Sequence, residues 1–166
     1  MKKIYVVLIP LFLFNCISTQ PQQNREGRRP FDTAEYKFVK LNGNCEISGE
    51  IIVPQRNGAD EPCSGCVITL NPATSYSEEF YIKTVQNGIP IEEADLRVLK
   101  YIRRAVADDS GNFAFKNIAK GKYYLYSPIT YEIRKPTGGY TKTNGYVYKT
   151  VYIREKQKVE IVLKKN

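Results

Sequence analysis

Apolar and polar residues alternate through several stretches of the chain, and the clearest of these stretches spans residues 107–126. Phe113 and Phe115 alternate with small or polar neighbours, and Tyr123 and Leu125 resume the alternation after a short break. A period of two places every second side chain on the same face of a β-strand. The pattern therefore predicts two strands joined by a bend, with these four residues in the core.

Turn-forming residues separate the strands of this stretch. Asp109-Ser110-Gly111-Asn112 combines a glycine, which accepts positive φ angles, with side chains that bond to their own backbone. Asp108 precedes this group, but the spaced acids and the closing glutamate of a calcium loop are missing. We therefore interpret Asp108 and Asp109 as turn residues rather than as metal ligands.

Alternation elsewhere predicts further strands, at residues 45–53, 66–70, 131–135, 146–154 and 159–163. Gly49 interrupts the first of them and indicates a bulge or the close approach of another backbone. Asn144 and Gly145 are predicted to form a turn. Together these elements predict an all-β fold.

The stretch between residues 71 and 106 has no clear period and is interpreted as an insertion. Residues 71–88 are expected to form a strand or an edge loop. A short helix near 91–96, followed by a strand from 98 to 107, is expected to complete the insertion. Periodicity leaves the choice between helix and strand open for residues 91–104.

Two motifs in the predicted strands carry a family resemblance. The first is Asp108-x-x-Gly111-x-Phe113-x-Phe115 with Gly121-x-Tyr123 and Leu125 after it, and the second is Ile47-Ser48-Gly49-x-Ile51. They resemble the carboxypeptidase regulatory-like domain, also described as transthyretin-like or CnaB-like. The resemblance implies a single antiparallel immunoglobulin-/transthyretin-like β-sandwich. It also implies a binding or assembly module, because in enzymes this domain accompanies a metallopeptidase and does no chemistry itself.

The first sixteen residues have the pattern of an export signal. Lys2 and Lys3 precede an apolar stretch over residues 4–14, which is too short to span a bilayer. The sequence Leu13-Phe14-Asn15-Cys16 that follows resembles a bacterial lipoprotein signal. The resemblance implies cleavage before Cys16 and a lipid on its thiol. Ordinary secretion with cleavage elsewhere is the alternative, although no Ala-x-Ala-like site follows.

Three regions follow from this organisation. Residues 1–15 are the predicted lipoprotein signal peptide, and residues 16–35 are the lipidated Cys16 with a flexible tether. The tether is expected because residues 17–35 are rich in Gln, Asn, Arg and Pro and have little to bury. Residues 36–166 are the predicted sandwich. The protein is expected at the cell envelope, on the periplasmic or exposed face of the outer membrane, with membrane lipid as a partner.

Three cysteines remain for disulfide bonds if Cys16 is acylated. Cys63 and Cys66 are close enough in sequence to bridge across a glycine turn, and we prefer this pair, with Cys45 unpaired. A bridge from Cys45 to either of them is the alternative. A redox site is disfavoured because a strand, not a helix, follows the Cys-x-x-Cys motif. A zinc site is disfavoured because three cysteines without histidine would need a carboxylate ligand.

Composition argues against an enzyme. The chain has no histidine, which removes Ser-His-Asp and Cys-His arrangements and the commonest general base. Its candidate acid pairs are adjacent in sequence, and adjacent residues on a strand point to opposite faces. We therefore predict no catalytic residue, no metal and no cofactor. The net charge of +8 includes no dense basic run, so no nucleic-acid partner is expected.

Tyrosine is abundant, with 13 residues and no tryptophan. Tyr124, Tyr126, Tyr148 and Tyr152 are candidate surface-binding aromatics, since exposed rings on a sheet can stack on sugars. Cross-strand packing is the alternative role for these rings. The prediction is thus a membrane-anchored, non-catalytic binding or assembly module with an envelope or extracellular protein or glycan as its partner. The alternative function is an adhesin that binds glycans or host polymers through exposed tyrosines.

Replacing Cys16 with serine tests the predicted anchor. The Cys16→Ser variant should lose labelling by radioactive palmitate in a bacterial host, because the thiol that carries the lipid is gone. Label that persists in the variant, at the level of the unchanged chain, would contradict a lipid on Cys16.

Overall fold

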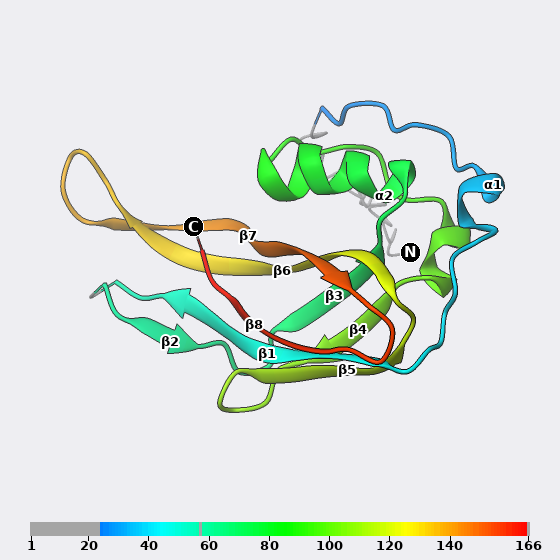
Figure 1. Cartoon of the computed structure of the whole chain (residues 1–166). Coiled ribbons are helices and arrows are strands. Elements are labelled where there is room, and N and C mark those ends of the chain that lie inside the picture. Colours follow the sequence, from blue (N-terminus) through cyan, green and yellow to red (C-terminus); the bar gives the residue numbers. More distant parts are fainter. Residues whose placement is uncertain (1–23, 57, 166) are drawn as a thin grey trace, which may run out of the picture.

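The computed structural model describes residues 24–56 and 58–165 (Figure 1). The predicted signal peptide and Cys16 lie outside these residues. Two four-stranded sheets form the body of the protein, and helical segments lie on one side of it (Figure 1). The predicted all-β sandwich is confirmed.

The first sheet is built around β1 (Cys45–Pro54). Strands β5 (Asn112–Ile118) and β2 (Asp60–Pro62) pair with β1 in antiparallel orientation. The final strand β8 (Lys158–Leu163) pairs with β1 in parallel orientation, so the sheet is mixed at this pairing. The predicted close approach at Gly49 occurs here, because a Cβ added to Gly49 would lie 1.9 Å from the carbonyl oxygen of Ile161.

The second sheet has the order β4 (Arg103–Val106), β3 (Val67–Pro72), β6 (Gly121–Arg134) and β7 (Tyr140–Ile153), with antiparallel pairs throughout. Strands β6 and β7 form a long hairpin, paired from Gly121 and Ile153 to Arg134 and Tyr140. The predicted turn at Asn144 and Gly145 is wrong, since both residues pair within this hairpin. Their turn-like composition is overridden by cross-strand pairing with β6.

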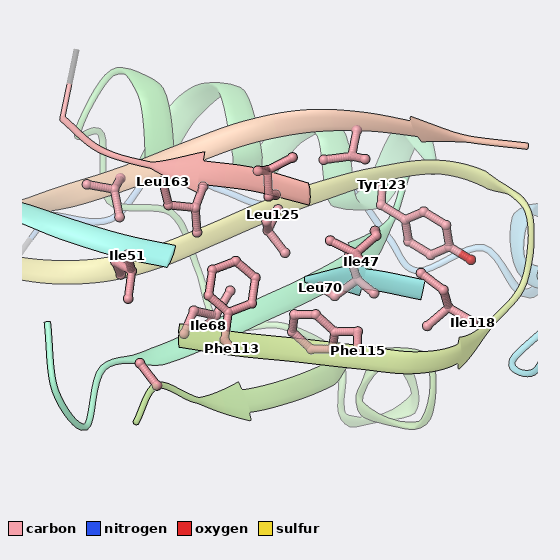
Figure 2. Packing of buried hydrophobic residues seen from close by; sticks show 14 of the residues in the cluster. Ile47, Ile51, Ile68, Leu70, Phe113, Phe115, Ile118, Tyr123, Leu125 and Leu163 are labelled. Carbon is pink, nitrogen blue, oxygen red and sulfur yellow. The ribbon is translucent and has the colours of Figure 1, made fainter. Parts of the chain in front are cut away.

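The core lies between the two sheets (Figure 2). Phe113 and Phe115 from β5 meet Tyr123 and Leu125 from β6, as the alternation predicts. Other aliphatic residues complete this layer, among them Ile47, Ile51, Ile68, Leu70 and Leu163 (Figure 2). Burial of this apolar surface is the main favourable contribution to the sandwich.

A helical cover replaces the predicted strand or edge loop over residues 71–88. Helix α2 (Ser75–Phe80) continues directly into the π-helix η1 (Tyr81–Gln86). Thr74 caps α2 through a reciprocal capping box with Ser77. Tyr81 and Val85, four residues apart, face the sheet and pack on the outward tyrosines of β6. The spacing of four residues between the apolar side chains of Tyr81 and Val85 is typical of a helix, and the prediction of a strand or loop overlooked it.

The rest of the insertion follows the expected order with shifted boundaries. A 3₁₀-helix, η2 (Leu96–Lys100), replaces the helical turn expected near 91–96. Strand β4 then occupies residues 103–106, inside the predicted strand of 98–107. Residues 91–104 therefore contain both a helix, η2, and the first two residues of a strand, β4.

The prediction of a flexible tether fails for residues 24–35, which pack on the domain. The backbone N–H of Glu26 donates to the Pro90 carbonyl, and the N–H of Glu92 donates to the Glu26 carbonyl, each at 2.9 Å. The short helix α1 (Thr33–Tyr36) follows, and Phe31 stacks on Tyr36 with ring centroids 4.9 Å apart. Polar composition was misleading because backbone pairing and a few aromatic rings order this segment.

The cysteine pairing agrees with the prediction. Cys63 and Cys66 form a disulfide across the turn that precedes β3. Cys45 is a buried free thiol, and its Sγ donates to the Arg154 carbonyl at 3.0 Å. The disulfide therefore closes a local turn, and it makes no link between distant strands.

The Gly49→Ala substitution tests the close packing of β1 and β8. The added methyl group would overlap the backbone of Ile161, so the strands must separate, and we expect a loss of about 1–3 kcal/mol in the free energy of unfolding. Denaturant unfolding measures the loss. Gly27→Ala is the matched control, because its Cβ meets nothing within 4 Å and should change stability by less than about 0.5 kcal/mol. Equal stability of the two variants would contradict the described β1–β8 contact.

Candidate functional site

A hollow of about 860 Å³ lies between the C-terminal end of η1 and the β6–β7 hairpin. We call it the hairpin hollow. Its lining comes from the helix end (Thr84, Val85, Gln86, Asn87, Gly88, Pro90), from the hairpin (Pro128, Ile129, Thr130, Tyr131, Asn144, Gly145, Tyr146, Tyr148) and from Lys165. This volume falls within the usual range of small-molecule sites.

Three half-buried tyrosines line the hairpin hollow, two of them on β7. Tyr146 and Tyr148 are two residues apart, so they share one face of the strand, while Val147 between them is buried in the core. The ring of Tyr148 meets Tyr81 edge-on at 5.7 Å, and the ring of Tyr146 meets Tyr126 edge-on at 6.2 Å. These contacts hold both rings in place and leave part of each accessible.

The polar groups beside these rings are mostly neutral. Gln86, Asn87 and Asn144 contribute amides, and the Thr130 hydroxyl donates to Asn144 Oδ1 at 2.9 Å. On the core-facing side of the hairpin, the ammonium of Lys165 lies 4.4 Å from the centroid of the Tyr131 ring, which packs against the sandwich core. The Tyr146 hydroxyl is protonated near neutral pH, as in any tyrosine, and can donate; burial raises its pKa further. Aromatic faces with neutral donors and acceptors suit a ligand rich in hydroxyl groups.

The structure separates the four tyrosines that the sequence predicts as surface-binding aromatics. Tyr148 lines the hairpin hollow, and Tyr152 is 69% exposed but lies outside it. Tyr124 and Tyr126 are only 3% and 8% exposed. The prediction of surface rings is therefore wrong for Tyr124 and Tyr126.

The reason for this burial is the helical cover. Tyr124 stacks on Tyr81 with ring centroids 4.2 Å apart, and its hydroxyl donates to Glu78 Oε1 at 2.7 Å. Burial, followed by the hydrogen bond to Glu78, raises the pKa of Tyr124. Tyr126 packs against Phe80 at 5.7 Å. Both tyrosines point away from the sandwich core, as predicted, and α2 and η1 cover them.

Several residues of the hairpin hollow had no signal in the sequence. Asn144 and Gly145 have the composition of a turn, and Gln86 and Asn87 belong to a segment without a clear period. Gly145 lets the Tyr131 ring lie close, since an added Cβ would be 3.2 Å from that ring. Asn144 and Gly145 lie next to Tyr146 on β7, whereas long-range packing brings Gln86 and Asn87 to the same hollow.

Two further observations concern metal binding and membrane-spanning helices. Within residues 24–56 and 58–165, no group of three or more His, Cys, Asp or Glu residues is placed to hold a metal ion. Asp108 instead accepts bonds from the N–H groups of Ser110 and Asn112, as a turn residue does, and these bonds lower its pKa. In the same part of the chain, no helix has the length and apolar character needed to cross a membrane.

Comparison with known proteins yields a structural match and no family. No family model matches the chain, and no curated protein matches it. A "putative carbohydrate binding protein" of Pseudomonas aeruginosa is similar, with a TM-score of 0.72 and 26% identity, over 83% of this chain and 99% of that one. The carboxypeptidase regulatory-like assignment thus stays a prediction.

Pilin subunits match more weakly. The major pilin subunit of Bacillus cereus has a TM-score of 0.42 and 18% identity, and the match covers 74% of this chain and 30% of the pilin. The minor pilin of Streptococcus agalactiae has a TM-score of 0.38 and 16% identity, over 75% of this chain and 44% of the pilin. These likenesses are too distant to bear on function.

Alanine at Tyr124 and at Tyr152 tests the helical cover. Tyr124→Ala should lower the free energy of unfolding by about 3–5 kcal/mol, because it leaves a cavity under η1. Tyr152→Ala should change it by less than about 0.5 kcal/mol, because that ring is exposed. Thermal or denaturant unfolding of both variants measures the difference. Similar small losses would mean that the cover does not pack on Tyr124.

Proposed function

We propose that this protein is a non-catalytic carbohydrate-binding module of the cell envelope, held at a membrane by a lipid on Cys16. The hairpin hollow is the proposed site. Tyr146 and Tyr148 supply the aromatic surface, and the amides of Gln86, Asn87 and Asn144 supply hydrogen bonds. We propose that the protein binds the saccharide and catalyses no reaction on it, in keeping with a chain that has no histidine.

The observation that carries the proposal is the pair of half-buried rings on one strand face beside neutral amides. A pyranose ring has an apolar C–H face and a rim of hydroxyl groups. The apolar face packs on an aromatic ring, while hydroxyl groups exchange hydrogen bonds with side-chain amides. The lining offers both kinds of contact within a volume of about 860 Å³. The similar protein of Pseudomonas aeruginosa, described as a putative carbohydrate-binding protein, supports this choice of ligand.

The rings of Tyr146 and Tyr148 are held in position before a ligand binds, which lowers the free-energy cost of ordering them on binding. Tyr148 is held edge-on by Tyr81, and Tyr146 by Tyr126. Binding a sugar then orders few side chains, and each side chain ordered on binding costs about 0.5–1.5 kcal/mol. Preorganised rings therefore lower the entropic cost of saccharide binding.

The anchor is the second part of the proposal. It rests on the lipoprotein-like pattern at Cys16, which lies outside the described residues. Each buried methylene contributes about 0.8 kcal/mol, and stable attachment needs more than one acyl chain. A diacylglyceryl group with an acylated amino terminus provides that number. The sandwich would then present its hairpin hollow to glycans at the envelope surface.

Saccharide binding by Tyr148→Ala tests the proposed site. The unmodified chain should bind at least one of a set of neutral trisaccharides, such as maltotriose, cellotriose or chitotriose, by isothermal titration calorimetry. Tyr148→Ala should weaken that binding about three- to tenfold, because an aromatic contact contributes up to about 1.5 kcal/mol.

The matched control is Tyr152→Ala, which removes an exposed ring from the same strand outside the hollow. It should bind as the unmodified chain does. Equal effects of the two substitutions would place the binding elsewhere, and an absence of binding across all neutral and acidic saccharides would refute the proposed function.

A further inference from the structure

A second hollow, of about 500 Å³, lies over the outer face of the second sheet. We call it the arginine hollow. Its polar lining includes Arg25, Arg28, Asn71, Arg104 and Tyr126, and its acidic lining is Glu92 and Glu93. Thr84 and Pro90 line both hollows, so the two sites are neighbours.

Two buried polar atoms in the arginine hollow have no partner among the described residues. They are Arg28 Nε and Asn71 Oδ1, and Asn71 is only 4% exposed. Buried polar side-chain atoms are nearly always hydrogen-bonded, because leaving them unpaired costs free energy. One of these atoms is a donor and the other is an acceptor. A ligand that both accepts and donates hydrogen bonds would satisfy the two together.

Arg28 and Arg104 supply positive charge to the hollow, whereas the charge of Arg25 is paired with Glu93. The guanidinium of Arg28 lies 4.2 Å from the Tyr76 ring centroid and 5.6 Å from that of Phe80. Neither Arg28 nor Arg104 has a side-chain ion pair within the described part of the chain. Burial raises the pKa of Tyr126, while a hydrogen bond from the Asn71 side chain and the charges of Arg28 and Arg104 oppose that rise, so it is the Oδ1 atom of Asn71 that lacks a partner.

The acidic residues of the arginine hollow are already engaged. Glu93 Oε1 pairs with Arg25 at 3.1 Å, and Glu92 Oε2 accepts from the backbone N–H of Arg28 at 3.2 Å. Glu92 keeps its charge in the hollow, but neither carboxylate forms an ion pair with Arg28 or Arg104 among the described residues, so both guanidinium groups have donors left for a ligand. Arginine binds carboxylates strongly because its planar fork offers paired, charge-assisted hydrogen bonds.

We propose that the arginine hollow binds the uronate unit of an acidic polysaccharide. The carboxylate would accept from Arg28 and Arg104, and a ring hydroxyl would donate to Asn71. This inference rests on the proposed function, since it names the acidic class of saccharide for a site next to the hairpin hollow. The shared boundary at Thr84 and Pro90 lets one oligosaccharide reach both hollows.

Galacturonate and galactose are a matched pair of probes, because they differ only in the carboxylate at C6. At low salt, galacturonate should bind the full chain at least tenfold more tightly than galactose, as measured by NMR titration. Added salt should weaken galacturonate binding and leave galactose unchanged, since screening acts on the charged pair. Trigalacturonate should bind more tightly than galacturonate if the ligand is a polymer that spans both hollows.

Arg28→Gln should remove the preference for galacturonate. Arg104→Gln should reduce it with no change in thermal stability, because Arg104 is exposed and unpaired within the described residues. Arg29→Gln is the matched control. Arg29 is the next residue in the chain, pairs with Glu35 at 3.6 Å and lies outside the arginine hollow, so its loss should leave the preference intact.

The outcomes separate this inference from the proposed function. Equal affinity for galacturonate and galactose, or equal losses in Arg28→Gln and Arg29→Gln, would overturn the uronate site and leave neutral saccharide binding at Tyr148 standing. Binding of galacturonate that depends on Arg28, with no neutral saccharide bound, would support the uronate site and refute the role of the hairpin hollow.

Discussion

Strand β6 is buried on both of its faces over residues 123–127, and the rest of the molecule is arranged around that constraint. Tyr123 and Leu125 pack into the sandwich core, while Tyr124 and Tyr126 point the other way. An antiparallel sheet commonly leaves one face to water. Here α2 and η1 lie across the outward tyrosines, so this sheet is covered on both sides over part of its length (Figure 1).

The helical cover is shorter than the hairpin beneath it, and both hollows lie at its margins. Past the end of η1 the hairpin continues, which leaves Tyr146 and Tyr148 half-buried. On the other margin, the N-terminal segment around Arg28 folds back over the sheet. A π-helix is rare and is frequently found near functional sites. In this protein η1 contributes residues to the hairpin hollow, and its Thr84 also borders the arginine hollow.

The two hollows differ in chemistry in a way that suits different parts of one saccharide. The hairpin hollow offers tyrosine rings and neutral amides, whereas the arginine hollow offers guanidinium groups with two unpaired buried atoms. Both are built mainly from backbone-paired or aromatic-packed segments, so their shapes exist before a ligand binds. Preformed sites of this kind place specificity in the positions of a few polar groups.

Local alternation in the sequence predicted most of the strands and the inward positions of Phe113 and Leu125, and the short spacing of Cys63 and Cys66 predicted their disulfide. These features depend on residues a few positions apart. A period of two assigns a side chain to a face, but it does not say what covers that face. Only the tertiary structure placed η1 over Tyr124, paired β8 with β1 in parallel, and tied residues 24–35 to the insertion. Each of those contacts joins segments distant in the chain, so no local pattern contains them, and the burial of Tyr124 and Tyr126 depends on the first of them.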